Sequence, residues 1–186
     1  MMEKGTYGYL NKKHETAAIR TAAFFGFTLL LVLLGRVFLK QYSNVFIICA
    51  IISVVPAAMS AVNLIMYLRY KTGRKEVFDE TEEARGSIPV LYDCVFTTEK
   101  ESYGANAVGI INKNIIIYSE YASFDAAGLE KHLSYITKKN GFKNWTIKVF
   151  TELEKYTGRL SYLKEKEIRL TKTDREMVEL VKAIIL

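Results

Sequence analysis

A stretch of 27 residues, 42–68, contains no Asp, Glu, Lys or Arg, and this feature limits the possible folds more than any other. Its last 24 residues, at a rise of about 1.5 Å each, exceed the roughly 30 Å of a bilayer's hydrocarbon core. A second apolar run lies just upstream, between Arg20 and Arg36. Arginine side chains at the ends of a span reach the lipid headgroups. The sequence therefore predicts transmembrane helices over residues 17–39 and 45–68.

The rest of the chain predicts a soluble domain that follows this hairpin. Residues 76–186 are polar enough to face water, and about 110 residues suffice to bury one core. The expected fold class is a membrane α-helical hairpin followed by a cytoplasmic α+β domain with a four-stranded mixed sheet. Residues 1–16 are expected to form a cytoplasmic N-terminal segment.

Positive charges flank the predicted hairpin mainly on the side of its two outer ends, whereas the connecting turn holds only Arg36 and Lys40. Lys and Arg close to a span resist translocation, so this distribution places both termini in the cytoplasm and the protein in the cell membrane as a multi-pass protein. Basic side chains at this position also attract anionic lipids. The expected headgroup contacts are Lys12, Lys13, Arg20, Arg69, Lys71, Arg74 and Lys75.

The formal net charge of +6 is unevenly distributed. Residues 1–75 carry ten Lys and Arg against Glu3 and Glu15, which gives +8, whereas residues 76–186 carry sixteen against eighteen Asp and Glu, which gives −2. The basic charge therefore belongs to the membrane half. A lipid surface accounts for it, and nucleic acid is not an expected partner.

Small residues recur at four-residue spacing on both predicted spans. Such stripes let helix backbones approach closely in lipid, and we expect them to pack within the hairpin. A second possibility is that the stripe of the second span packs on another subunit. The residues expected to pack are Ala18, Ala22 and Gly26 on the first span, and Ser53, Ala57, Ala61 and the polar Asn63 on the second.

Periodicity predicts the order helix, three strands, helix, strand, helix, helix for the domain. Asn112-Lys113-Asn114 contains residue types that tolerate the positive φ of a tight hairpin turn. Thr173 and Glu176 have the spacing of a capping box at the start of the last helix. The strands are expected at 88–98, 105–111, 115–119 and 145–150, the last of them parallel to a preceding strand.

This order resembles the core of the restriction-endonuclease-like PD-(D/E)xK nuclease superfamily over residues 76–150. The resemblance implies an acid at the end of the second core strand and an acid-x-Lys pair on the third, which bind a divalent metal and activate water. Residues 105–111 contain no acid, and Ser119-Glu120-Tyr121 lacks the lysine. The carboxylates open to a displaced site are Asp93, Glu99 and Glu120; no metal or cofactor is expected.

The whole chain is also similar to small uncharacterised two-span proteins of Gram-positive bacteria. The exit from the second span at residues 66–70 and the segment 91–96 carry this resemblance. It implies a membrane location and carries over no particular function. Cys49 and Cys94, one in a span and one in a predicted strand, are expected to be small apolar fillers.

The leading expectation is a membrane-anchored, non-catalytic adaptor or scaffold that presents its cytoplasmic domain to a protein partner or to further copies of itself. The alternatives are a membrane-tethered nuclease-like phosphoesterase with a displaced or degenerate site, and an accessory subunit of a larger membrane complex. The expected contact surfaces are an acidic segment and the apolar stripe of the last helix. Their residues are Asp79, Glu80, Glu82 and Glu83, and Met177, Leu180, Val181 and Ile184.

Overall fold

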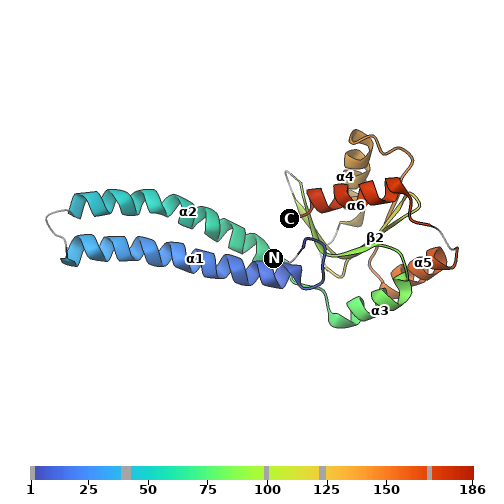
Figure 1. Cartoon of the computed structure of the whole chain (residues 1–186), viewed down its shortest axis with the longest axis horizontal. Helices are drawn as coiled ribbons and strands as arrows, with labels where there is room; N and C mark the ends of the chain where they lie inside the picture. The colour runs from blue at the N-terminus through green and yellow to red at the C-terminus, as the bar shows by residue number, and fades with distance from the viewer. Residues whose placement is uncertain (1–2, 39–42, 99–100, 122–124, 167–168) are drawn as a thin grey trace. The chain divides into compact units, whose positions relative to one another are not determined.

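The computed structural model describes residues 3–38, 43–98, 101–121, 125–166 and 169–186, so the candidate Glu99 lies outside the described residues (Figure 1). The chain divides into two compact units. Leu10–Lys71 forms a helical hairpin, and Met1–Tyr9 together with Thr72–Leu186 forms an α+β domain. The predicted order of two long apolar helices followed by an α+β domain is confirmed.

The hairpin consists of α1 (Tyr9–Leu33), which continues into a short π-helix, η1 (Leu34–Phe38), and of α2 (Ser43–Arg69). Both helices are long and apolar enough to cross a membrane. They also expose large apolar side chains: Ile52 is 66% exposed and Ile65 is 67% exposed. This surface suits lipid rather than water. The first helix begins at Tyr9, before the predicted boundary at residue 17.

Hydroxyl pairs and small residues form the contact between α1 and α2. Thr21 Oγ1 lies 2.9 Å from Ser60 Oγ, and Thr28 Oγ1 lies 2.8 Å from Ser53 Oγ. Ala17, Ala50 and Ala57 are buried beside them. Interhelical hydrogen bonds and close backbone approach are the interactions that associate helices in lipid.

The packing stripe of α1 therefore differs from the predicted one. Ala22 and Gly26 are exposed, and a Cβ atom at Gly26 would meet nothing within 4 Å. Ala17 and Thr21, each one position earlier than the predicted Ala18 and Ala22, are buried instead. The hydroxyl of Thr21 explains the shift, because a buried hydroxyl needs a partner and Ser60 supplies it.

On α2 the structure places four predicted packing residues differently from one another. Ala57 is buried, Ser53 bonds to Thr28, and Ala61 is half-buried. Asn63 is exposed and thus faces away from α1. Spacing alone does not distinguish the face that meets α1 from the face that meets the surroundings.

The domain is built on a four-stranded mixed sheet in the order β1-β2-β3-β4. The first three strands are antiparallel, and β4 runs parallel to β3, as predicted. Asn112 and Lys113, with φ of 46° and 58°, form the tight turn between β2 and β3. The strands are β1 (Val90–Thr97), β2 (Ser102–Ile111), β3 (Asn114–Tyr118) and β4 (Thr146–Phe150).

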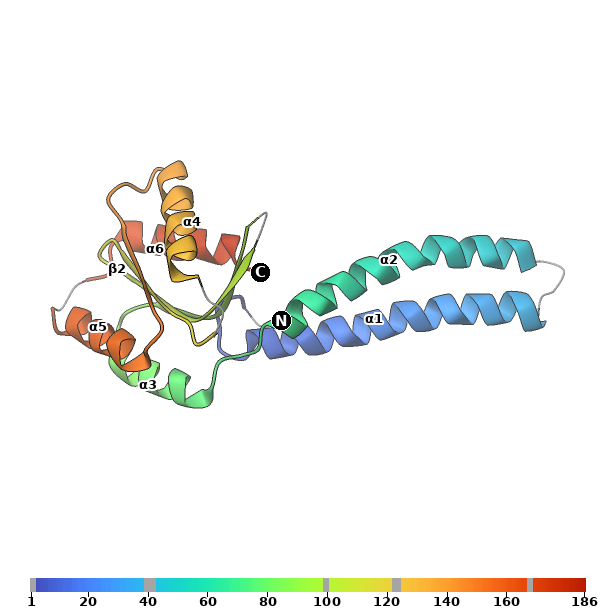
Figure 2. The same ribbon diagram turned by 180° about the vertical axis from the view of Figure 1, so that it is seen from behind.

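Two helices cover each face of the sheet (Figures 1 and 2). One face is covered by α3 (Lys75–Arg85) and α5 (Leu153–Glu165). The α5 side chains Tyr156 and Leu160 are fully buried there. Leu129 and Leu133 are buried under α4 (Ala126–Lys139) on the opposite face. The α6 helix (Lys172–Ile184) lies on the same face as α4 and contributes Met177 and Val181.

The last helix begins two residues earlier than its predicted capping box. Thr171 is the N-cap, and its hydroxyl accepts a hydrogen bond from the backbone N–H of Asp174 at 3.1 Å. The Asp174 carboxylate in turn accepts the N–H of Thr171 at 2.9 Å. Thr171 and Asp174 share the spacing of Thr173 and Glu176, but Asp174 is buried and its carboxylate also accepts the N–H of Lys113. This tertiary contact selects the earlier pair.

Candidate functional site

Asp93 interrupts the regular alternation of β1. Its φ of 52° lies in the left-handed region, which Asp tolerates better than most residues. Tyr92 packs under α3 and α5, whereas Cys94, which alternation would place on the same face, packs under α4 and α6. The opposite residues of β2, Ala107 and Ala105, divide between the same two clusters. The β1–β2 ribbon therefore changes faces at Asp93.

The Asp93 carboxylate binds two chain segments that lead into the hairpin. Oδ2 accepts the Gly8 N–H and the Thr72 hydroxyl, both at 2.8 Å, and Oδ1 accepts the Gly73 N–H at 3.2 Å. Gly8 directly precedes α1, and residues 72–73 follow α2. Asp93 is only 2% exposed. A buried carboxylate with three donors is a strong structural contact, because charge-assisted hydrogen bonds are about twice as strong as neutral ones.

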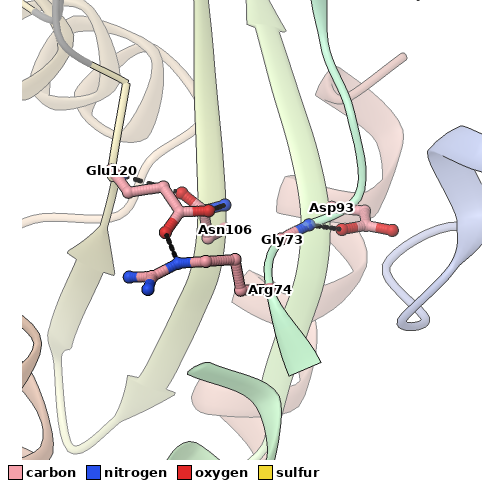
Figure 3. A network of polar contacts seen from close by, with 5 residues as sticks. All are labelled: Gly73, Arg74, Asp93, Asn106 and Glu120. Atoms are coloured by element: carbon pink, nitrogen blue, oxygen red, sulfur yellow. Dashed lines mark hydrogen bonds and ion pairs between the residues drawn. The ribbon is translucent and has the colours of Figure 1, made fainter. Parts of the chain in front are cut away.

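A second carboxylate, Glu120, lies on the other side of Asn106 (Figure 3). Its Oε2 accepts the Nε–H of Arg74 at 3.0 Å, and its Oε1 accepts the Nδ2–H of Asn106 at 3.1 Å. The backbone N–H of Glu120 returns a 2.9 Å bond to Asn106 Oδ1. The hydrogen bond to Glu120 raises the pKa of the exposed Arg74 guanidinium.

Gly73 connects these two carboxylates. Its N–H binds Asp93, and a Cβ atom at this position would stand 2.8 Å from Asn106 Nδ2. A side chain would therefore displace the buried Asn106 amide. We call the set Gly73, Arg74, Asp93, Asn106 and Glu120 the root cluster.

The carboxylates of the root cluster are engaged by other groups of the protein. Each described candidate carboxylate already accepts two or more hydrogen bonds from the protein, which leaves few lone pairs for a metal ion or an attacking water. Over the described ranges, no three His, Cys, Asp or Glu side chains lie together as metal ligands. The structure thus brings Asp93 and Glu120 into one polar network with Asn106 between them (Figure 3).

Sequence reasoning overlooked Gly73 and Asn106. One signal was present: Asp93 and Asn106 are each surrounded by small or apolar residues within a predicted strand. A polar residue in such a run is buried and needs a partner. The pairing register, which sets Tyr92 opposite Ala107 and Cys94 opposite Ala105 and so brings Asp93 and Asn106 onto neighbouring strands, cannot be read from the sequence.

The predicted acidic surface is divided by the structure. Asp79, Glu80 and Glu83 are exposed on α3. Glu82 is half-buried and accepts bonds from Arg85 at 2.7 Å and from the Tyr92 hydroxyl at 2.6 Å. Burial raises the pKa of Glu82, but these two hydrogen bonds outweigh it and lower the pKa overall.

The predicted apolar contact stripe lies against the sheet. Met177 is fully buried and Val181 is 1% exposed, while Leu180 and Ile184 pack partly buried against the same core. These side chains therefore belong to the core of the domain and are not accessible as a contact surface. Exposed Asp79, Glu80 and Glu83 remain as the accessible part of the predicted contact residues.

Most of the predicted headgroup contacts are exposed, including Lys12, Arg69, Lys71 and Lys75. Lys13 is half-buried. Arg20 is exposed but its Nε–H reaches Ser60 Oγ at 3.2 Å, and Arg74 binds Glu120 in the root cluster. Cys94 is fully buried, and burial raises the pKa of its thiol, in keeping with a filler role.

Comparison with known proteins gives no match: neither protein-family models, nor curated proteins, nor solved structures are similar to this chain.

Proposed function

We propose that this protein is a membrane-anchored adaptor without catalytic activity, in which the hairpin holds the α+β domain at the cytoplasmic face for a protein partner. The observation that carries the proposal is the bonding of Asp93 to both chain segments that lead into the hairpin. Both chain segments that lead into the hairpin therefore start from one buried carboxylate of the domain. An anchor in the membrane raises the effective concentration of the domain for a partner in the same membrane.

The cytoplasmic orientation rests on two observations. Met1–Tyr9 belongs to the same compact unit as Thr72–Leu186, so the chain enters and leaves the hairpin from one unit. Exposed basic residues lie close to both ends of the hairpin: Lys12 near the start of α1, and Lys71 and Lys75 shortly after the end of α2. The positive-inside rule assigns that side to the cytoplasm.

Cysteine labelling tests the orientation. Single cysteines at Asn44 and at Lys166 are introduced in a Cys49→Ala background, with the buried Cys94 left in place. A membrane-impermeant maleimide applied to intact cells should label position 44 and should reach position 166 only after permeabilisation. The reverse pattern would overturn the proposed orientation.

The absence of catalysis is proposed because Asp93 and Glu120 serve as structural acceptors. Purified full-length protein in nanodiscs should leave DNA and RNA intact with Mg²⁺ or Mn²⁺. Metal-dependent cleavage that is lost in Glu120→Gln would overturn the proposed adaptor function and assign a phosphoesterase activity instead. Glu120→Gln keeps an acceptor for Asn106, so loss of activity would not reflect unfolding.

Crosslinking in the native membrane tests the adaptor role itself. We expect one protein in fixed stoichiometry with the full chain, and a reduced yield when Asp79, Glu80 and Glu83 become Gln. The exposed acids Glu152, the N-cap residue of α5, and Glu154 in its first turn, changed in the same way, serve as the matched control. An unchanged yield in the first variant, or only self-crosslinks, would contradict an acidic contact surface.

A second candidate function, an accessory subunit of a larger membrane complex, is favoured by one specific observation. The small residues Ala22 and Gly26 are exposed on α1 rather than packed on α2. Small residues on a lipid-facing surface allow another helix to approach closely. Gly26→Leu should then reduce the size of the assembly in mild detergent, whereas Phe27→Ala, at an exposed position about 100° around the helix, should not. Equal sizes for Gly26→Leu and the unchanged protein would count against this candidate.

A further inference from the structure

The two edges of the sheet are treated differently. Along β1, the Tyr92 N–H donates to Gly5 O at 2.8 Å, and the Leu186 N–H donates to Val95 O at 3.1 Å. Ile185 forms an isolated bridge with Phe96. Segments from both ends of the chain therefore cover the β1 edge. Among the described residues, the other edge strand, β4, pairs with β3 alone.

The backbone of β4 presents a row of polar groups on its outer side. The Thr146 N–H donates to Lys113 O at 2.9 Å, and Phe150 O accepts the Ser119 N–H at 3.1 Å, so these residues face β3. Because backbone groups alternate in direction along a strand, the N–H and C=O groups of Ile147 and Val149 point away from β3, toward the open side of β4. Outward N–H and C=O groups are a template for another strand.

One side chain occupies part of this row. Glu130 of α4 accepts the Val149 N–H on Oε1 at 2.8 Å. Its carboxylate oxygen stands where the carbonyl of a neighbouring strand would bind. Glu130 therefore caps the edge from within the chain and blocks uncontrolled pairing. A ligand strand would have to displace it.

The segment that leads into and includes β4 is basic in sequence. Residues 131–151 contain five lysines and no Asp or Glu, whereas residues 76–130 contain eleven Asp and Glu against three Lys and Arg. Four of these lysines, Lys131, Lys138, Lys139 and Lys143, are exposed, as is Lys148 on β4 itself. A displaced Glu130 would leave this edge more positive still.

A shallow groove of about 310 Å³ runs beside β4 on the face shared with α5. Lys148 and Arg159 supply two positive charges, and Phe150 and Ile116 supply apolar surface. No carboxylate lines it among the described residues. Its full lining is Asn114, Ile116, Thr146, Lys148, Phe150 and Arg159.

We propose that the β4 edge binds an extended acidic segment of a partner protein by strand addition. The partner's backbone pairs with Ile147 and Val149, and its alternate acidic side chains lie over Lys148 and Arg159. Main-chain hydrogen bonds provide affinity in this recognition mode, and alternate side chains provide specificity. The inference rests on the proposed adaptor function and names the chemistry of its partner.

The test uses full-length protein in nanodiscs of phosphatidylcholine and a fluorescein-labelled nine-residue peptide of alternating Glu and Val. The same peptide with Lys for Glu is the ligand control. Fluorescence anisotropy should show binding of the acidic peptide alone. Lys148→Glu with Arg159→Glu should weaken binding about tenfold or more, because like charges would then face each other. Lys155→Glu, an exposed α5 position outside the groove, should leave binding unchanged.

Two backbone-directed variants separate strand addition from simple charge attraction. Ile147→Pro removes an outward N–H without removing a bond to β3, and edge strands tolerate proline in that orientation. It should abolish peptide binding. Glu130→Ala removes the internal cap and should tighten binding several-fold. Binding that is unaffected by both variants would overturn strand addition.

Competition identifies the remaining outcomes. Inorganic phosphate or a mononucleotide that displaces the peptide at micromolar concentration would turn the groove into a site for a small anion and would overturn the proposal. Peptide binding with the expected variant pattern, but no crosslinked partner in the cell, would retain the β4 edge and reject the adaptor. A crosslinked partner whose yield Ile147→Pro does not change would retain the adaptor and reject the β4 edge as its binding site.

Discussion

The hairpin and the domain place polar and apolar side chains in opposite ways. Ile65 of the hairpin is 67% exposed, whereas Ile115 of the domain is fully buried. Hydroxyls such as those of Thr21 and Ser60 lie between the helices of the hairpin, while the domain encloses an apolar core. The medium around each unit explains the contrast: lipid offers no hydrogen bonds to exposed polar groups, and water does.

The two units also differ in how they satisfy buried polar groups. The hairpin uses neutral pairs, each of two hydroxyls. The domain uses a carboxylate, Asp93, which accepts hydrogen bonds from three donors in two chain segments. A neutral pair can separate at modest cost, whereas a buried carboxylate that loses donors is strongly destabilising. The following changes test this difference.

The largest effect is expected for Asp93→Ala. The change leaves the N–H groups of Gly8 and Gly73 and the hydroxyl of Thr72 without their acceptor, and it places alanine at a positive φ. The free energy of unfolding of the domain should fall by about 3 kcal/mol. Urea unfolding of the full chain in nanodiscs, followed by fluorescence of the single Trp145, measures it. Exposed Asp79→Ala is the control; equal losses would remove the special role of Asp93.

A smaller effect is expected in the hairpin for Thr21→Val combined with Ser60→Ala. The pair removes both hydroxyls together, and the Nε–H of Arg20, which donates to Ser60 Oγ, belongs to an exposed side chain that can bond elsewhere. Interhelical hydrogen bonds in membranes contribute about 0.6 kcal/mol on average, and we expect a loss of about 1 kcal/mol or less. Titration with a denaturing detergent, followed by helix-to-helix energy transfer, measures it. A loss as large as that of Asp93→Ala would break the comparison between the two units.

The buried hydroxyl of Tyr156 provides a change of opposite sign. This side chain is fully buried, and its hydroxyl has no hydrogen-bond partner among the described residues. Burial raises the pKa of Tyr156, so the phenol stays neutral near pH 7. Tyr156→Phe removes an unsatisfied group and should stabilise the domain by up to about 1 kcal/mol. Destabilisation in the same urea experiment would reveal a partner for the hydroxyl.

The smallest effect concerns acid sensitivity at Glu82. Hydrogen bonds lower the pKa of its folded form below the ordinary value near 4.5. A lowered pKa adds stability above that value, and the added stability is lost as the pH falls through the folded pKa. Glu82→Gln should therefore lower stability slightly at pH 7 and least at low pH, so that the decline in stability below pH 4.5 becomes flatter. An unaltered slope would show that other carboxylates control acid unfolding.

Local patterns predicted the elements because their causes are local. The charge-free run at residues 42–68, the Asn112-Lys113 turn and the alternation in β4 each depend on neighbouring residues. The predictions shifted where a distant partner decides. Thr21 needs Ser60, and Asp174 is selected by Lys113. The root cluster joins residues from positions 73 to 120, and no sequence spacing encodes that pairing.

The membership of Met1–Tyr9 in the domain affects how the chain is made. Gly8 and Asp93 are separated by 85 residues, so at about 5–20 residues per second Gly8 leaves the ribosome roughly 4–17 s before its acceptor. The bond forms only if both ends of the hairpin emerge on one side of the membrane. A molecule inserted with a single span would keep a buried carboxylate short of donors and a sheet edge without its cover. With the hairpin inserted in a membrane as proposed, the hydrogen bonds to Asp93 therefore close only after both helices have been inserted.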